Sequence, residues 1–181
     1  MKLNTAIPAL ISGACIAISC ETQVDAPKSD FLSMPTLIVE NSQTVMADSG
    51  KIELIMSFPL MEQYTHVEKP YYEFTKGIRV NFFDGDTVLH GSVTAKYAKF
   101  DETSEIWELK DSVVVINIEG DKLETELLNW DQKKDLIYTD RFVKMTGPEQ
   151  ITQGIGFEAD SHLNRQHIKK VSAVIYVEGE E

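Results

Sequence analysis

The chain has 181 residues, of which 43% are hydrophobic and 25% charged, and its formal net charge is -12 at pH 7. This length fits one domain with an appendage, and the composition is sufficient for a hydrophobic core. The acidic balance argues against nucleic acid as a partner, because such binding needs clustered Lys and Arg, and against adsorption on an anionic bilayer by charge alone.

The N-terminal segment predicts a lipoprotein signal over residues 1–19. Lys2 precedes an apolar run over residues 6–19, which is short for a transmembrane helix and typical of a secretory signal. Small residues come just before Cys20, which we predict to be the lipid anchor and the new N-terminus; Cys15 is a second candidate. An uncleaved anchor helix and a plain signal peptide are the alternatives.

Residues 20–35 then read as a lipidated Cys followed by a polar, Pro-containing tether. Both cysteines of the chain lie before this tether, which excludes a disulfide scaffold and a Cys-based zinc site in the body of the protein. The remaining residues, 36–181, form one predicted domain.

From about residue 50 the domain reads as β-structure, with short Val-, Ile-, Tyr- and Phe-rich runs between turn signals such as Asp-Gly and Glu-Gly. Within residues 36–64 a short helix is expected, around residues 54–56 or 60–61. The fold class is therefore all-β.

Internal repetition is the strongest structural signal. Similar strands recur at intervals of about 30 residues, over residues 73–85, 106–120, 136–147 and 168–179. Val80, Val113, Val143 and Val174 occupy matched positions. The connectors repeat as well and end in Asp101, Asp131 and Asp160, which predicts turn chemistry for these carboxylates.

Alternation along each strand gives the repeats one apolar face and one polar face. The polar face includes Lys110, Lys144 and Lys170. Stacking such repeats yields a jelly roll, an elongated sandwich or a β-solenoid with a continuous hydrophobic interior. The apolar face collects Phe74, Ile78, Val80, Phe82, Trp107, Leu109, Val113, Val115, Ile137, Val143, Met145, Ile168, Val174 and Tyr176.

The pair Gly154 and Gly156 opens the third connector, which continues into Phe157. No helix follows the glycines and no βαβ unit surrounds them, so a dinucleotide site is a poor interpretation. Glycine in a strand marks a bend, a bulge or the close approach of another group, and we predict either a bend in the sheet or room for a ligand.

No catalytic constellation emerges. The four histidines lack metal-type spacing, the nucleophile-elbow, zinc-protease and P-loop motifs are missing, and the recurring Asp residues suit turns. We therefore expect no metal site.

Residues 36–177 resemble the LptC family of periplasmic lipopolysaccharide-export proteins, in the lipoprotein type seen in Bacteroidetes. The resemblance rests on DKLETELLNWDQKKDLIYTDRFVKM, ITQGIGFEAD and HIKKVSAVIYV. The same short patterns occur in the related LptA and OstA-like domains. The N-terminal signal favours LptC, although better-known members keep a transmembrane helix where this chain has a lipobox-like Cys.

The resemblance implies an antiparallel β-jelly roll, open along one side, with no enzymatic activity and no cofactor of its own. It further implies a periplasmic protein anchored to the inner membrane, which takes lipopolysaccharide from an ATP-driven transporter and hands it to an LptA-like bridge protein. The apolar face, together with Phe157, would line the acyl-chain groove; the alternative is that the same face simply packs into a closed core. The last strand is the predicted partner edge, through Val171, Ala173, Ile175 and Val177, and an ordinary internal strand is the alternative.

Two other functions compete with this one. One is an envelope lipoprotein that binds a glycan or a protein through the same sheet, which a fully packed apolar face, or a polar or aromatic platform, would favour. The other is an envelope hydrolase of β-fold, which would need two carboxylates converging in a cleft.

Overall fold

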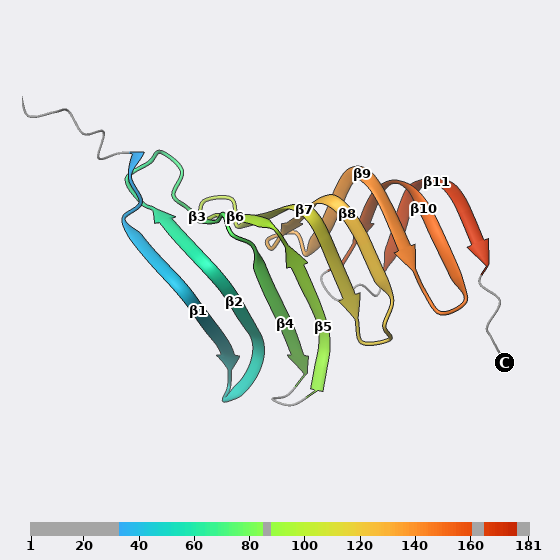
Figure 1. Ribbon diagram of the computed structural model, residues 1–181, viewed down its shortest axis with the longest axis horizontal. Helices are drawn as coiled ribbons and strands as arrows, with labels where there is room; N and C mark the ends of the chain where they lie inside the picture. Colours follow the sequence, from blue (N-terminus) through green and yellow to red (C-terminus); the bar gives the residue numbers. More distant parts are fainter. Residues whose placement is uncertain (1–32, 85–87, 161–164, 177–181) are drawn as a thin grey trace, which may run out of the picture.

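The computed structural model describes residues 33–84, 88–160 and 165–176, and these form one antiparallel sheet of 11 strands (Figure 1). The prediction of an all-β, antiparallel jelly roll is confirmed. The strands are β1 (Leu37–Asp48), β2 (Lys51–Tyr64), β3 (Tyr71–Phe74), β4 (Ile78–Asp84), β5 (Val88–Ala95), β6 (Tyr97–Asp101), β7 (Ile106–Asn117), β8 (Lys122–Asp131), β9 (Leu136–Thr146), β10 (Gln150–Ala159) and β11 (Gln166–Tyr176).

The predicted short helix is wrong. Residues 51–64 form β2, which pairs with β1 along almost its full length. Leu54, Ile55 and Met56 alternate between the two faces of this strand rather than following a helical stripe. The pairing with β1 and β4 decides the conformation, because a short apolar run alone is compatible with either element.

The long strands bend, so that the sheet folds into two facing arms. Strand β7 pairs with β6 through residues 106–110 and with β5 through residues 114–117. Strand β2 likewise pairs with β3 near its end and with β4 near its start. In Figure 1, strands β7 to β11 arch over in the same way. We call the half with β4 and β5 arm A, and the half with β3 and β6 arm B.

Register shifts mark the crease between the arms. They interrupt the ladders between Lys110 and Val113 in β7 and between Thr125 and Asn129 in β8. Asp111 and Ser112 have positive φ angles there. The Thr125 hydroxyl donates a 2.9 Å hydrogen bond to the Phe142 carbonyl, so it satisfies a backbone group that the interrupted ladder leaves unpaired.

The hydrophobic core fills the space between the arms. Phe74 of arm B and Val80 of arm A belong to the same buried cluster, together with Val113, Val143 and Phe157 near the crease. The apolar face predicted from the sequence is therefore the inner face of the folded sheet, and the polar face is the outer one.

The matched valines of the repeat do not all occupy equivalent places in the sheet. Val80 and Val174 share a cross-strand row with Val115 and Met145. Val113 and Val143 instead pair with Thr125, in the next inner row toward the crease. The bulges add residues to individual strands, so equal sequence spacing does not translate into equal register.

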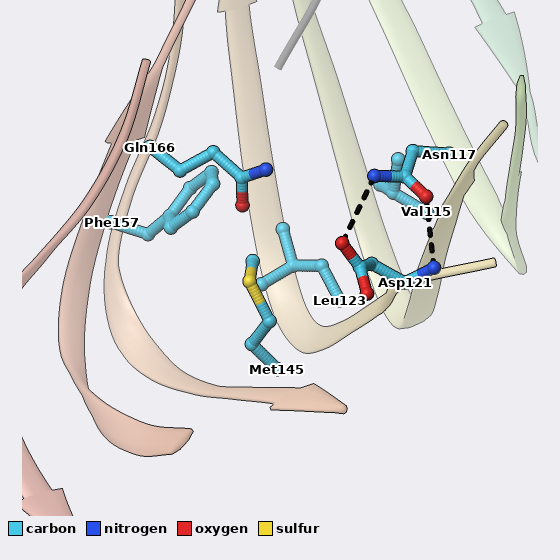
Figure 2. A pocket seen from close by; sticks show the side chains of 7 residues that line it. All are labelled: Val115, Asn117, Asp121, Leu123, Met145, Phe157 and Gln166. Carbon is cyan, nitrogen blue, oxygen red and sulfur yellow. Dashed lines mark hydrogen bonds between the residues drawn. The ribbon is translucent and has the colours of Figure 1, made fainter. Parts of the chain in front are cut away.

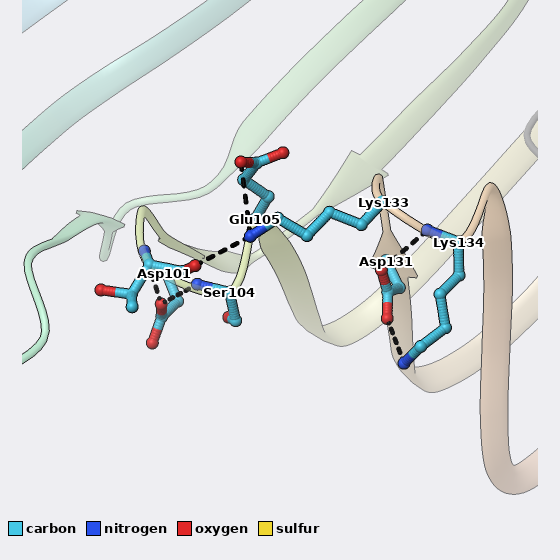
Figure 3. A network of polar contacts seen from close by, with 7 residues as sticks. Asp101, Ser104, Glu105, Asp131, Lys133 and Lys134 are labelled. Atoms are coloured by element: carbon cyan, nitrogen blue, oxygen red, sulfur yellow. Dashed lines mark hydrogen bonds and ion pairs between the residues drawn. The ribbon is translucent and has the colours of Figure 1, made fainter.

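The turns that close arm B confirm the predicted role of Asp101 and Asp131. Asp101 Oδ1 accepts hydrogen bonds from the backbone N–H groups of Thr103 and Ser104, at 2.9 and 2.8 Å. Asp131 Oδ1 accepts one from the N–H of Lys134 at 3.0 Å, and the Lys134 ammonium lies 2.7 Å from Oδ2. Figure 3 shows both turns.

Successive turns also contact one another. The Gln132 N–H donates to the Glu105 carbonyl at 3.1 Å, and the Lys133 ammonium reaches the Thr103 carbonyl at 3.0 Å and the Glu105 carboxylate at 3.4 Å. The repeat therefore stacks turn on turn along the margin of arm B (Figure 3).

Candidate lipid-binding interior

The inner face of arm A carries a cross-strand row that extends from one edge of the sheet to the other. Each member pairs with the next across a ladder, and none has a charged side chain. In strand order the row is Thr44, Met56, Val80, Val93, Val115, Leu123, Met145, Thr152 and Val174.

Arm B has an equivalent row, which is richer in aromatic residues and also uncharged. It consists of Leu37, Gln63, Tyr72, Phe100, Trp107, Trp130, Ile137, Ala159 and Gln166. Burial, and after it the neighbouring Glu102 carboxylate, raises the pKa of the Tyr72 hydroxyl, so this side chain stays neutral at physiological pH.

Aromatic rings pack against one another in arm B. Phe100 stacks on Trp107 with ring centroids 4.8 Å apart, and Trp107 lies 5.8 Å from Phe74. Phe74 in turn meets Phe58 of β2 edge-on at 5.2 Å. Such pairs are favourable beyond the area they bury, so this part of the interior is a well-defined wall.

The predicted groove residues are brought together, with two exceptions, both in β11. Phe74, Ile78, Val80, Leu109, Val113, Val115, Val143 and Phe157 are buried in the core cluster, and Phe82, Trp107, Ile137, Met145 and Ile168 pack against it. Val174 lies on the inner face but is 45% exposed, because it belongs to the edge strand β11, where no further strand covers it. Tyr176, also in β11, is exposed as well.

The interior is closed in this structure. Val143 and Phe157 are 0% exposed. The cavity between the arms has a volume of about 10 Å³ and is lined by Val115, Leu123 and Met145 from arm A and by Phe157 and Gln166 from arm B, with Asn117 and Asp121 at its mouth (Figure 2). That volume is about the minimum needed for one water molecule, so an acyl chain would have to part the arms.

Sequence reasoning missed several inner residues. Leu123 and Leu128 are 3% exposed core residues, while Met56, Val93, Tyr72, Phe100 and Trp130 complete the rows. Apolar residues alternate in the strands 97–101 and 122–131, and this alternation predicts an inner face. The repeat, however, places these strands as connectors, so their inward-facing residues are not assigned to it. Met56 was obscured by the expected helix.

The predicted edge strand has a different alternation from the expected one. Val171 pairs with Gly154 and Val174 pairs with Thr152, so both lie on the inner face. Ala173 and Ile175 face outward. A register shift opposite Gln153 and Gly154 inserts Ser172 as an extra residue. Val171 therefore lies on the inner face, whereas uninterrupted alternation from Ala173 would place it on the outer face. Val177 lies outside the described residues, as do Cys20 and the signal segment.

The glycine pair lies at register shifts of β10. A Cβ on Gly154 would overlap the Ile168 side chain and come within 2.5 Å of the Lys170 carbonyl oxygen. Gly156 has a φ angle of 80° at a second shift, between Ile155 and Phe157. The group that approaches these glycines closely is the neighbouring strand β11.

The outer face carries ion pairs together with exposed apolar side chains such as Phe142 and Ile155, which are 51% and 52% exposed. Glu124 lies 2.8 Å from the Lys122 ammonium and 3.9 Å from that of Lys144, and Glu158 lies 2.6 Å from the Lys169 ammonium. A hollow of about 710 Å³ on this face is lined by charged residues of both signs, including Lys110 and Glu126, and by the apolar side chains of Leu127 and Phe142. These partly exposed pairs keep the outer face hydrated and contribute little to stability.

Within the described ranges, no group of three His, Cys, Asp or Glu side chains could hold a metal ion. In the same residues, no helix is long and apolar enough to cross a membrane.

The chain matches a known protein family over most of its length. The family model described as "Lipopolysaccharide-assembly, LptC-related" matches residues 6–176. No curated protein matches the chain. The family acts in lipopolysaccharide transport in the periplasm and is a transport and binding family rather than an enzyme family. Its partners belong to the lipopolysaccharide transport machinery. The chain belongs to this LptC-related family of lipopolysaccharide-assembly proteins.

Proposed function

We propose that the protein binds the acyl chains of lipopolysaccharide between its two arms and passes the lipid from an inner-membrane ATP-driven transporter to an LptA-like bridge protein. The observation that carries this proposal is the pair of uncharged inner rows, which reach from edge strand β1 to edge strand β11. A lipid moving across the strands would meet no charged side chain in either row.

Burial of acyl chains provides the driving force for opening the arms. Each methylene transferred from water contributes about 0.8 kcal/mol, so a chain of about 12 carbons offers on the order of 10 kcal/mol before opposing costs. This gain offsets the arm-to-arm contacts that are lost when Met145 and Phe157 separate. The lipid thus replaces side-chain contacts with contacts of its own.

The phosphates of the lipid stay outside the interior. The inner rows offer them no cation, and the protein as a whole carries a net charge of -12. Charges more than about 8 Å apart are largely screened at physiological salt, so repulsion from the surface is weak compared with acyl burial. The protein would therefore hold the lipid by its tails and leave the head group in water.

Handover takes place at β11. This strand pairs with β10 on one side, and its other side is a free edge able to accept a strand from a partner. Over residues 166–176 it carries Lys169 and Lys170 and no acidic residue, whereas β1 carries Glu40 and Asp48 and no basic residue. The opposite charges favour an acidic partner strand at β11 and a basic partner strand at β1. Successive carrier proteins would therefore join in one orientation.

Membrane attachment is through acyl chains on Cys20. Metabolic labelling with a fatty acid should label the wild-type protein and the Cys15→Ser variant but not Cys20→Ser. Label retained in Cys20→Ser and lost in Cys15→Ser would assign the anchor to Cys15 instead.

The function is tested by photo-crosslinking of the full chain to purified lipopolysaccharide. The crosslinking residue replaces Met145 or Ile137, which are half-buried on the inner face, or their outward-facing neighbours Lys144 and Tyr138 in the same strand β9. Adducts at the two inner positions but not at the two outer ones are expected.

Equal labelling at Lys144 and Tyr138 would instead favour the competing function, in which a glycan or protein binds through the outer face of the sheet. No adduct at any position, with the variants folded, would refute lipid binding between the arms.

A further inference from the structure

Trp130 carries the one buried side-chain nitrogen or oxygen atom, among the residues described, that has no hydrogen-bond partner. The atom is the indole Nε1, whose N–H is a donor only. Buried polar groups are nearly always paired in folded proteins, so an unpaired donor calls for a specific explanation.

The surroundings of Trp130 explain why no protein group pairs with it. On the inner face its cross-strand neighbours are Trp107 and Ile137, and neither side chain has an acceptor. The nearest carboxylate in sequence, Asp131, is already engaged by the backbone and ammonium of Lys134. The donor is therefore held in an apolar wall.

The position of Trp130 within arm B is informative as well. β8 ends at Asp131, one residue later, whereas the crease lies in the other direction, at the register shift between Thr125 and Asn129. Val113, Val143 and Phe157, which lie near the crease, are among the most deeply buried side chains, at 0–1% exposure. A lipid whose tails point to the crease would place the head of an acyl chain near Trp130.

We propose that the Trp130 indole N–H donates a hydrogen bond to the carbonyl oxygen at the head of a bound acyl chain; this inference rests on the proposed lipid-binding function. A hydrocarbon tail has no acceptor and leaves the donor unpaired. The ester or amide carbonyl at the head of each acyl chain supplies one. Trp130 thus distinguishes an acylated lipid from plain hydrocarbon and sets how deeply its chains enter.

The chain itself supplies a matched control, because it has two tryptophans and they face each other across the β7–β8 ladder. With ¹⁵N-labelled tryptophan the full chain gives two indole N–H signals in an NMR spectrum. Addition of purified lipopolysaccharide should move the Trp130 indole proton downfield, as a new hydrogen bond does, and move the Trp107 signal less.

Substitution gives an independent measurement. Trp130→Phe keeps an aromatic ring and removes the donor, so affinity for lipopolysaccharide should fall about fivefold to tenfold, the equivalent of one neutral hydrogen bond. Trp107→Phe should change it less. Against a fatty-acid methyl ester and a hydrocarbon of equal length, Trp130→Phe should weaken binding of the ester alone.

Lipopolysaccharide binding with an unmoved Trp130 signal and equal affinities of the two variants would overturn the inference and leave the proposed function standing. If the wild-type chain binds neither lipopolysaccharide nor the methyl ester, the proposed function itself is wrong. The wild-type NMR measurement decides the matter even if Trp130→Phe does not fold.

Discussion

At the scale of single residues, Gly154 shows how one missing side chain allows the sheet to bend. Strand β11 lies so close that a methyl group on Gly154 would meet both the Ile168 side chain and the Lys170 carbonyl oxygen. Neither a backbone carbonyl nor a packed inner side chain can give way easily. The residue type at this position is therefore dictated by the neighbouring strand.

We predict that Gly154→Ala lowers the free energy of unfolding by about 1–3 kcal/mol, the range typical of overpacking. Gly147→Ala is the control, because its Cβ would mainly meet the movable Asp121 carboxylate, at 3.0 Å. Urea denaturation of both variants measures the difference. Equal free energies of unfolding of the two variants would show that β11 can move away from β10 without loss of stability.

Asp131 makes stability depend on pH. Its hydrogen bond and ion pair with Lys134, together with the backbone N–H groups, hold the pKa of the Asp131 carboxyl below its ordinary value. A carboxyl with a lowered pKa in the folded state stabilises the protein above its unfolded-state pKa, which is about 3.9, and this contribution disappears as the pH falls through the folded-state pKa.

Asp131→Asn should therefore unfold at a lower urea concentration than the wild type at pH 7, and the difference should shrink as the pH falls below about 4. Asp140→Asn removes an exposed carboxylate whose nearest cation, Arg141, is 3.4 Å away, and should have little effect. A difference for Asp131→Asn that stays constant down to acid pH would mean that the carboxylate charge is not what stabilises the turn.

At the scale of elements, the two edge strands decide which molecules can join the sheet. Ile38 in β1 and Ile175 in β11 are similarly exposed, at 55% and 50%, and both face outward. Substitutions at these two positions can be compared directly, because each residue belongs to an edge strand and neither contributes to the core. The proposed handover to a bridge protein depends on β11 and not on β1.

A negative charge at an exposed position of β11 would repel the acidic partner strand proposed above and discourage strand addition. We predict that Ile175→Glu weakens binding of an LptA-like partner at least about tenfold, a loss typical of an interface contact, while Ile38→Glu leaves that binding unchanged. Thermal unfolding of each variant checks that the fold is intact. Loss of binding with Ile38→Glu and not with Ile175→Glu would reverse the assigned direction of transfer.

At the scale of the whole molecule, the separation of charge determines how lipid binding responds to salt. The inner rows are neutral, and the charged residues lie on the outer face and in the turns. Binding through tails alone involves no ion pair that salt could break. Salt should only weaken the long-range repulsion between lipid phosphates and the acidic surface.

Affinity for lipopolysaccharide should therefore stay constant or rise slightly between about 50 and 500 mM NaCl, concentrations over which exposed ion pairs are progressively screened. Displacement of a lipid-sensitive fluorescent dye measures this, with the methyl ester of a fatty acid as an uncharged reference. A steep fall in affinity with salt would show that cations of the protein hold the phosphates.

The sequence by itself determined the faces of the strands, the repeat and the turns. Alternation with period two separates residues such as Val143 from Lys144 without any knowledge of partners, because adjacent side chains of a regular, unbulged strand point to opposite faces. Asp101 and Asp131 were equally predictable, because a carboxylate that accepts hydrogen bonds from the next backbone N–H groups acts locally.

Only the tertiary structure decided where the sheet folds and which side chains it closes over. The bulges opposite Gly154 and after Lys110 depend on contacts between strands, and they placed Val171 on the same face as Val174 and offset the matched valines of the repeat. The strand β2 in place of a helix, the nearly filled interior and the unpaired Trp130 donor likewise follow from long-range pairing. The physical reason is that periodicity encodes local direction, whereas register and burial are set by neighbours distant in the chain.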